Sequence, residues 1–116
     1  MKILITGANG FLGLNVAKAA LHSGHKIFGI SQNDSNIKHI KKLIKFKKCT
    51  KNNYYNLEND IINFNPDIVL HFAWWGGNSY SDINSIEQFN KNIPLIFSLL
   101  DIIKKCPTKT KFIGVG

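Results

Sequence analysis

The chain alternates short apolar runs with longer stretches in which apolar residues recur every three or four positions. The short runs predict β-strands at residues 2–6, 26–31, 53–56, 67–72 and 111–115, of which the third has the weakest pattern. The longer stretches predict helices at residues 11–23, 36–44, 58–64 and 85–105. Gly24 and Pro66 end two of these helices, and Pro94 is expected to disturb the last one.

Strands and helices in this alternation predict an α/β fold built on a parallel sheet. Strongly apolar strands need helices over both faces of their sheet, and parallel strands need crossover connections, which are right-handed. The expected strand order is then 3-2-1-4-5. In such a sheet the ligand crevice lies above the carboxyl ends of the first and fourth strands.

The composition fits one globular domain with a basic surface. The chain has 116 residues, 44% of them apolar and 19% charged, and a net charge of +8. All 15 basic residues are lysines, whereas arginine supplies most bidentate readout of bases and phosphates. We therefore expect no nucleic-acid partner. The lysine-rich segment from Lys38 to Lys51 would equally attract a phosphorylated small molecule.

Targeting and metal-binding signals are missing from the sequence. No apolar run approaches the roughly 20 residues that span a bilayer, and the N-terminal run is too short for a signal peptide. A cytoplasmic protein with no membrane partner is the expectation. Cys49 and Cys106 have no metal-ligand spacing, so we predict two free thiols and no metal site.

The segment from Thr6 to Gly13 directly follows the first predicted strand and opens the first predicted helix. Gly7 permits the sharp turn, Gly10 lets the backbone approach a pyrophosphate, and Gly13 lets the helix pack close to the sheet. Amides and the positive dipole at the helix start then bind the anion. No Gly-Lys-Ser or Gly-Lys-Thr follows, which excludes a P-loop triphosphatase. The predicted contacts of this dinucleotide site are Gly7, Asn9, Gly10, Phe11, Leu12 and Gly13.

The Gly-x-x-Gly-x-x-Gly spacing after a strand that ends in Thr resembles the extended short-chain dehydrogenase/reductase family, which includes sugar-nucleotide epimerases and dehydratases. Residues 66–74 resemble its fourth strand, which usually ends in His-x-Ala-Ala. Residues 111–115 resemble the strand that delivers a catalytic Ser or Thr. Asn92 lies where the family has the Asn of an Asn-Val pair. Asn56-Leu57 lies where the family has an Asp-Leu pair that contacts the adenine. The resemblance covers the whole chain and implies a Rossmann-type fold, with further cofactor contacts at Asn56, Leu57, Phe72, Ala73, Trp74 and Asn92.

The end of the second strand bears on the choice of cofactor. NAD-dependent enzymes commonly place an acidic residue there to bind the adenosine ribose. Ser31 and Gln32 occupy this place and are predicted to contact the cofactor. Because serine does not repel a 2′-phosphate, both NAD and NADP are admissible, with a slight preference for NADP. Lys38 or Lys41 is the candidate cation for that phosphate.

Aromatic residues follow the fourth strand where the family has small ones. Trp74 takes the place of the second alanine, and Trp75 follows it. We expect at least one of the two indoles to face the cofactor or the substrate. His71 is predicted to be a structural residue rather than a catalyst.

The catalytic pair of the family is missing from the chain. In the family, a Tyr acts as acid and base, and a Lys four residues later lowers its pKa. At that spacing Tyr54, Tyr55 and Tyr80 are followed by Glu58, Asn59 and Asn84. We therefore predict no catalytic residue and no activity for the chain alone.

The resemblance implies an incomplete domain over residues 1–116. The expected function is the N-terminal, cofactor-binding part of an NAD(P)-dependent epimerase, dehydratase or reductase, whose nucleotide-sugar substrate binds only the full-length protein. The alternative is a non-catalytic NAD(P)-binding regulatory module. A fifth strand at an exposed edge predicts association, which leaves a homo-oligomer open.

Overall fold

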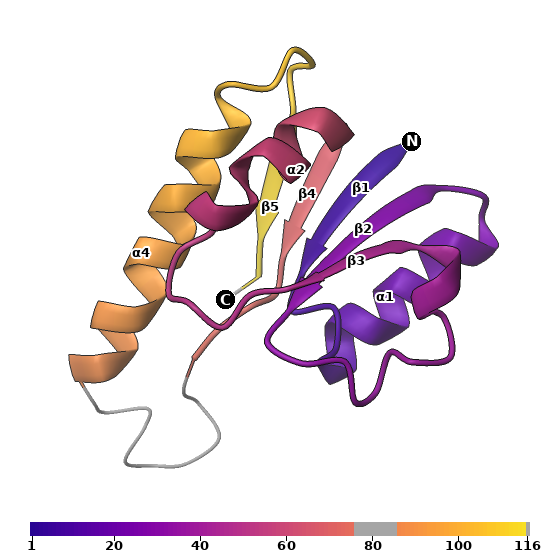
Figure 1. The fold of residues 1–116 in the computed structure, drawn as a ribbon, viewed down its shortest axis with the longest axis horizontal. Helices are drawn as coiled ribbons and strands as arrows, with labels where there is room; N and C mark the ends of the chain where they lie inside the picture. Colours follow the sequence, from indigo (N-terminus) through magenta and orange to yellow (C-terminus); the bar gives the residue numbers. More distant parts are fainter. Residues whose placement is uncertain (76–85, 116) are drawn as a thin grey trace.

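The strands of this protein form one five-stranded parallel sheet in the order β3-β2-β1-β4-β5 (Figure 1). The computed structural model describes residues 1–75 and 86–115. The strands are β1 Lys2–Thr6, β2 Lys26–Ser31, β3 Lys45–Lys48, β4 Ile68–His71 and β5 Lys111–Gly114. The α/β class and the strand order that the sequence predicts are confirmed.

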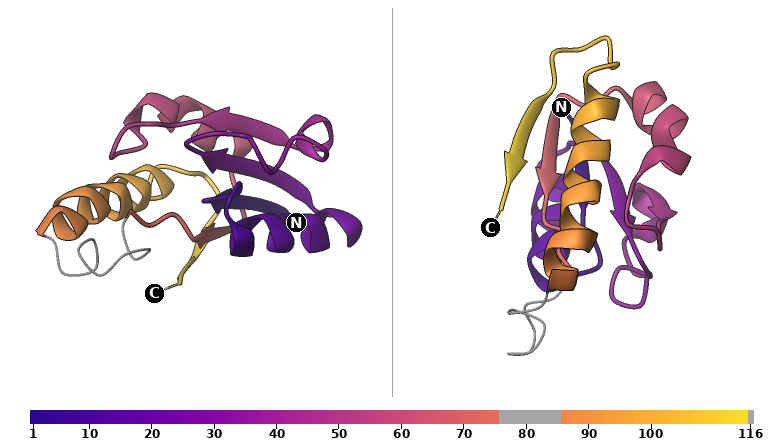
Figure 2. Two further views of the ribbon diagram at one scale, coloured as in Figure 1. Left: turned by 90° about the horizontal axis from the view of Figure 1, so that it is seen from below. Right: turned by 90° about the vertical axis from the view of Figure 1, so that its left-hand side faces the viewer.

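Helices cover both faces of the sheet (Figure 2). They are α1 Phe11–His22, α2 Glu58–Phe64 and α4 Ile86–Ile103, with short 3-10 turns η1 Lys41–Leu43 and η2 Tyr55–Leu57. Side chains of a strand point alternately to its two faces, so β1 serves both halves of the core. Ile3 and Ile5 pack on the side of α1, whereas Leu4 packs on the side of α2 and α4. Within the described residues, no helix has the length and apolar character needed to cross a membrane.

The predicted helix at residues 36–44 is wrong. Successive turns replace it, with hydrogen bonds from Ile37 N to Asp34 O and from Ile40 N to Ile37 O, and they lead into η1. The Asn9 side chain accepts hydrogen bonds from the amides of Asn36 and Ile37. These amides lie in the first turn of the predicted helix, where a short helix would have to nucleate. Because 3-10 turns also bring every third residue to one side, Ile37 and Ile40 are buried as the pattern requires.

The predicted third strand at residues 53–56 is also wrong, because β3 lies earlier, at Lys45–Lys48. This strand pairs with β2 at the edge of the sheet, where lysines are tolerated because one side of the strand faces solvent. In the segment that sequence analysis assigned to the strand, Tyr54 is buried and its N–H donates to Ser98 Oγ on α4 at 2.9 Å. The apolar pattern of this segment therefore reflects its attachment to α4 through Tyr54 and not a β-strand.

The remaining elements agree with the predictions to within two residues at each described end. Gly24 follows α1 with φ +87° and donates its N–H to Leu21 O, so it terminates the helix as expected. The helix α4 is continuous through Pro94. The predicted start of that helix at Ser85 lies outside the described residues.

Candidate functional site

A cleft of about 560 Å³ opens at the carboxyl ends of the central strands, where sequence analysis places the ligand. Its volume is in the range of small-molecule sites. The glycine loop and the segments after β2, β3 and β4 contribute to its walls. The predicted contacts that line the cleft are Gly7, Asn9, Gly10, Ser31, Gln32, Phe72, Ala73 and Trp74.

The start of α1 offers backbone amides beside this cleft. Gly10 is the N-cap residue and provides no side-chain acceptor, and no acidic residue stands in the first turn. The first intrahelical hydrogen bond runs from Leu14 N to Gly10 O, so the amides of residues 11–13 have no acceptor within the helix. Free amides and the helix dipole together suit an anion such as a pyrophosphate. Phe11 and Leu12 have exposed side chains that do not line the cleft, so only their backbone could contribute.

Two glycines of the loop are required by close backbone packing. A Cβ on Gly13 would lie 2.1 Å from the carbonyl oxygen of Gly7. Because Gly13 has no side chain, α1 can pack directly against the loop. Gly7 itself has φ +70°, and a Cβ there would lie 2.9 Å from Ala73 N in the segment after β4. Gly13 is buried and does not line the cleft. Its close packing agrees with the sequence prediction, and only its backbone amide is available for the predicted contact with a ligand.

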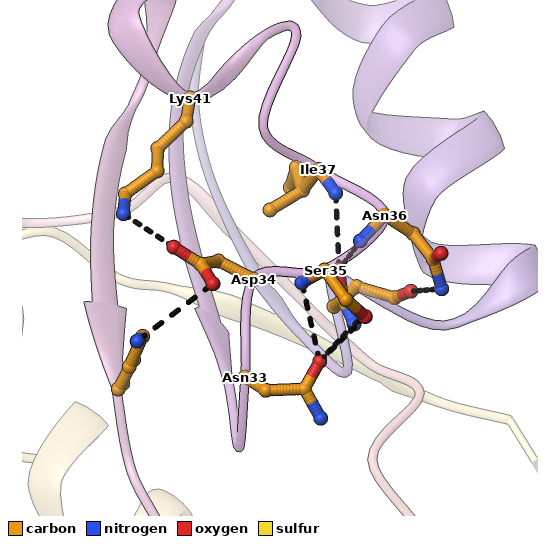
Figure 3. A network of polar contacts seen from close by, with 8 residues as sticks. Asn33, Asp34, Ser35, Asn36, Ile37 and Lys41 are labelled. Atoms are coloured by element: carbon orange, nitrogen blue, oxygen red, sulfur yellow. Dashed lines mark hydrogen bonds and ion pairs between the residues drawn. The ribbon is translucent and has the colours of Figure 1, made fainter.

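The side chain of Asn9 forms four hydrogen bonds with the loop after β2, whose residues 33–37 are labelled in Figure 3. Its Oδ1 accepts the N–H groups of Asn36 at 2.7 Å and Ile37 at 3.0 Å. Its Nδ2 donates to Asn33 Oδ1 at 2.6 Å and to Ser35 Oγ at 3.3 Å. We call these five residues the Asn9 network. Asn9 is 6% exposed, so the network fixes the loop after β2 against the glycine loop and leaves little of the side chain for a ligand.

The carboxylate of Asp34 belongs to the same loop but lies outside the cleft lining. Lys41 Nζ lies 2.6 Å from Asp34 Oδ2, and Lys48 Nζ lies 3.7 Å from Asp34 Oδ1. The hydrogen bond from Lys41 holds the pKa of this carboxyl group below its usual range. The charge of Asp34 is therefore directed to two lysines. Lys38 and Lys41 are the predicted candidates for binding a 2′-phosphate, and neither of them lines the cleft.

The two tryptophans after β4 both line the cleft, so the prediction for at least one of them agrees with their placement. Trp74 is 48% exposed and donates from Nε1 to Gln88 Oε1 at 3.2 Å. Asn92 does not line the cleft. Its buried amide instead accepts from Trp75 N at 2.7 Å and donates to Trp75 O at 2.8 Å. Asn92 therefore positions the segment after β4 from α4.

Part of the cleft wall comes from residues that sequence analysis does not assign to the dinucleotide site, namely Cys49, Lys51 and Tyr54. Lys51 ends the lysine-rich segment that is expected to attract a phosphorylated small molecule. The predicted adenine contacts do not reach this part of the wall, because Leu57 is buried in the core and Asn56 does not line the cleft. The wrong position of the third strand explains why Cys49, Lys51 and Tyr54 were not predicted, since ligands bind beyond the carboxyl ends of parallel strands. A search for the polar residues that follow 45–48 would have found them.

Of the described tyrosines, Tyr54 is buried in the cleft wall and Tyr55 is exposed on the surface. Burial raises the pKa of Tyr54 well above its usual range, so this phenol stays protonated. Tyr55 lies on the surface and donates to Asp101 Oδ2 at 3.0 Å. Tyr80, with Asn84 four residues later, lies outside the described residues.

His71 closes β4 beneath the glycine loop. A hydrogen bond of 2.7 Å joins its Nδ1 to Thr6 Oγ1, which also accepts from Ala73 N at 3.3 Å. Its Nε2 is buried and has no hydrogen-bond partner among the described residues. Burial lowers the pKa of His71 from 6.5 to about 4, because the charged form of the ring loses its hydration. This placement fits the structural role predicted for His71.

Stability is expected to fall between pH 7 and pH 5 because of His71. The folded pKa lies below the unfolded one, so the unfolded chain takes up a proton first as the pH falls below 6.5. The free energy of unfolding should drop by about 2 kcal/mol between pH 7 and pH 5, at about 1.4 kcal/mol per unit below pH 6.5. Urea titrations at several pH values measure it. His71→Asn, which lacks the titrating ring, should flatten the slope, and equal slopes in both proteins would contradict the assignment.

The sequence was compared with protein families and with individual proteins. The NAD dependent epimerase/dehydratase family matches residues 3–116. Protein CapI of Staphylococcus aureus is 31% identical over 111 residues, covering 87% of this chain and 33% of that protein. The dTDP-6-deoxy-L-talose 4-dehydrogenase (NAD(+)) of Aggregatibacter actinomycetemcomitans is 27% identical over 106 residues, covering 88% of this chain and 38% of that protein.

The fold was compared with solved structures. UDP-glucose 4-epimerase from Bifidobacterium longum, in complex with NAD+ and UDP, superposes with a TM-score of 0.85 at 21% identity. The match covers 100% of this chain and 37% of that one. The chain thus spans between 33% and 38% of the length of the relatives named here.

Proposed function

The chain belongs to the NAD-dependent epimerase/dehydratase family, and on that premise we propose that its cleft binds a nicotinamide dinucleotide. The cofactor serves an enzyme that epimerises, dehydrates or reduces a nucleotide sugar. The observation that carries the proposal is the set of free amides at the start of α1, which adjoin the cleft behind Gly10. The names of the relatives, a nucleotide-sugar 4-dehydrogenase and a UDP-glucose 4-epimerase with NAD+, support the cofactor and the substrate class.

We assign one part of the dinucleotide to each loop around the cleft. The amides of residues 11–13, next to Gly10 in the cleft wall, would bind the pyrophosphate, and Ser31 and Gln32 at the end of β2 would contact the adenosine ribose. Ala73 and Trp74 after β4 would contact the nicotinamide. The bound nicotinamide supplies hydride transfer to and from a sugar carbon. The residues of this chain bind and orient the cofactor for that step.

Gly10→Ala tests the proposal, because it separates binding from folding. Gly10 has φ −77° and ψ 169°, which alanine adopts readily, and a Cβ there would lie 3.3 Å from Gly7 O. We expect a change in the free energy of unfolding of no more than about 1 kcal/mol. The added methyl group stands where the pyrophosphate approaches, so the affinity for NADH and NADPH should fall at least about tenfold. Fluorescence titration of the reduced dinucleotides measures it.

Gly24→Ala is the matched control, because it should lower stability and leave the dinucleotide affinity unchanged. Gly24 has φ +87° with open space around it, so alanine there should cost about 1 kcal/mol in stability. It lies at the end of α1 opposite the cleft, and dinucleotide affinity should be unchanged. A wild-type chain that binds neither dinucleotide, or a Gly10→Ala variant that binds as tightly as wild type, would refute the proposed site.

A further inference from the structure

We propose that the cleft selects the 2′-phosphorylated dinucleotide NADP and that Lys51 binds the 2′-phosphate. The inference rests on the proposed function and adds its cofactor preference and a residue that determines it. Among the described residues that line the cleft, Lys51 is the one charged side chain, and no carboxylate is present. An anionic substituent therefore meets a cation and no like charge.

The end of β3 lies against the end of β2, where the adenosine ribose is expected. Cys49 N donates to Ser31 O at 2.9 Å, which continues the β2–β3 ladder by one residue. Lys51 follows two residues later and lines the cleft together with Ser31. A lysine side chain is long and flexible, so its ammonium group can reach a phosphate on the ribose at Ser31.

Asp34, the carboxylate nearest to Ser31 in the sequence, is kept away from this position. Its two oxygens face Lys41 and Lys48, and its side chain is 17% exposed. The residues on either side of it, Asn33 and Ser35, are both bonded to Asn9. The Asn9 network thus holds the backbone on both sides of Asp34, and the two ion pairs direct its carboxylate to lysines that do not line the cleft. An NAD-type contact from Asp34 to the ribose hydroxyls would require both ion pairs to break.

The other nearby lysines are engaged or distant, whereas Lys51 is available. Lys41 and Lys48 pair with Asp34, and Lys38 does not line the cleft. Within residues 1–75 and 86–115, the ammonium group of Lys51 forms no ion pair, and its side chain is exposed. A phosphate would be its first partner and would meet no competing carboxylate.

The experiment measures dissociation constants of NADPH and NADH for the wild-type chain, Lys51→Gln and Lys38→Gln. At low salt we expect the wild type to bind NADPH at least about fivefold more tightly than NADH, as one partly exposed charge pair gives. Lys51→Gln should reduce that ratio to less than about twofold, because it should weaken NADPH binding more than NADH binding. Lys38→Gln carries the same charge change outside the cleft and should keep the wild-type ratio.

A second pair of probes excludes effects of the nicotinamide end. Adenosine 2′,5′-bisphosphate should bind more tightly than adenosine 5′-monophosphate by the same factor, and added salt should reduce the difference. Equal binding of NADH and NADPH, or equal effects of the two lysine variants, would overturn the role of Lys51 and leave the proposed function standing. A folded chain that binds no dinucleotide at all would overturn both.

Discussion

Gly13→Ala should be the most damaging single-methyl substitution in the glycine loop. The new Cβ would lie 2.1 Å from Gly7 O and 2.8 Å from Gly7 C. Both are backbone atoms, so no side-chain rotation relieves the clash, and α1 would have to move away from the loop. We expect a loss of at least about 3 kcal/mol in the free energy of unfolding. For a domain of this size, that lowers the melting temperature by more than about 10 °C.

Thermal and urea unfolding measure this effect, and Gly10→Ala provides the control within the same loop. There the Cβ comes no closer than 3.3 Å to Gly7 O, so the same substitution three residues earlier should leave a folded protein. In an ordinary helix interior, glycine to alanine would raise stability by about 1 kcal/mol. A Gly13→Ala variant as stable as wild type would show that α1 does not pack on the loop as described.

Asn9→Ala should have the second largest effect, because it removes the centre of the Asn9 network. The amides of Asn36 and Ile37 lose their acceptor, and that of Ile37 lies at a buried residue. Leaving buried polar groups without partners costs about 1–3 kcal/mol each, so we expect a loss of about 2–4 kcal/mol in the free energy of unfolding. Binding of NADPH should weaken as well, because the loop after β2 forms one wall of the cleft.

Two measurements make this prediction specific to the network. Amide hydrogen exchange should accelerate at Asn36 and Ile37 more than elsewhere in the chain. Asn15→Ala removes a similar side chain from the exposed face of α1, where it donates only to Phe11 O at 2.8 Å. It should change stability by no more than about 0.5 kcal/mol. If Asn9→Ala costs no more than Asn15→Ala, the network does not stabilise the loop.

The glycine loop and the strand order could be predicted because their determinants are local in the sequence. A strand, a turn that needs a positive φ at Gly7 and an amphipathic helix together occupy residues 2–22, and each leaves its own pattern. The central strands are apolar on both faces, which only a covered parallel sheet explains. The placement of the cleft above β1 and β4 then follows from topology.

The errors arise where partners distant in the sequence decide the local structure. Sequence analysis treats residues 36–44 as a helix because Ile37, Ile40 and Ile44 have helical spacing, but Asn9 takes the first amides of that segment. Sequence analysis does not recognise the strand at Lys45–Lys48, because an edge strand can carry lysines. It therefore does not predict that Lys51 lines the same cleft as Ser31. The hydrogen bonds of the Asn9 side chain to the loop after β2 are likewise absent from the sequence analysis.

The sequence by itself determined the α/β class, the parallel order of the strands and the glycine turn at the start of α1, because hydrophobic periodicity and glycine spacing are properties of neighbouring residues. Only the tertiary structure decided which side chains face the cleft. Asp34 is turned to Lys41 and Lys48, Asn92 fixes the backbone of Trp75, and Lys51 lines the same cleft as Ser31. Each of these results depends on hydrogen bonds, ion pairs or strand register between separate segments, and no local pattern records them.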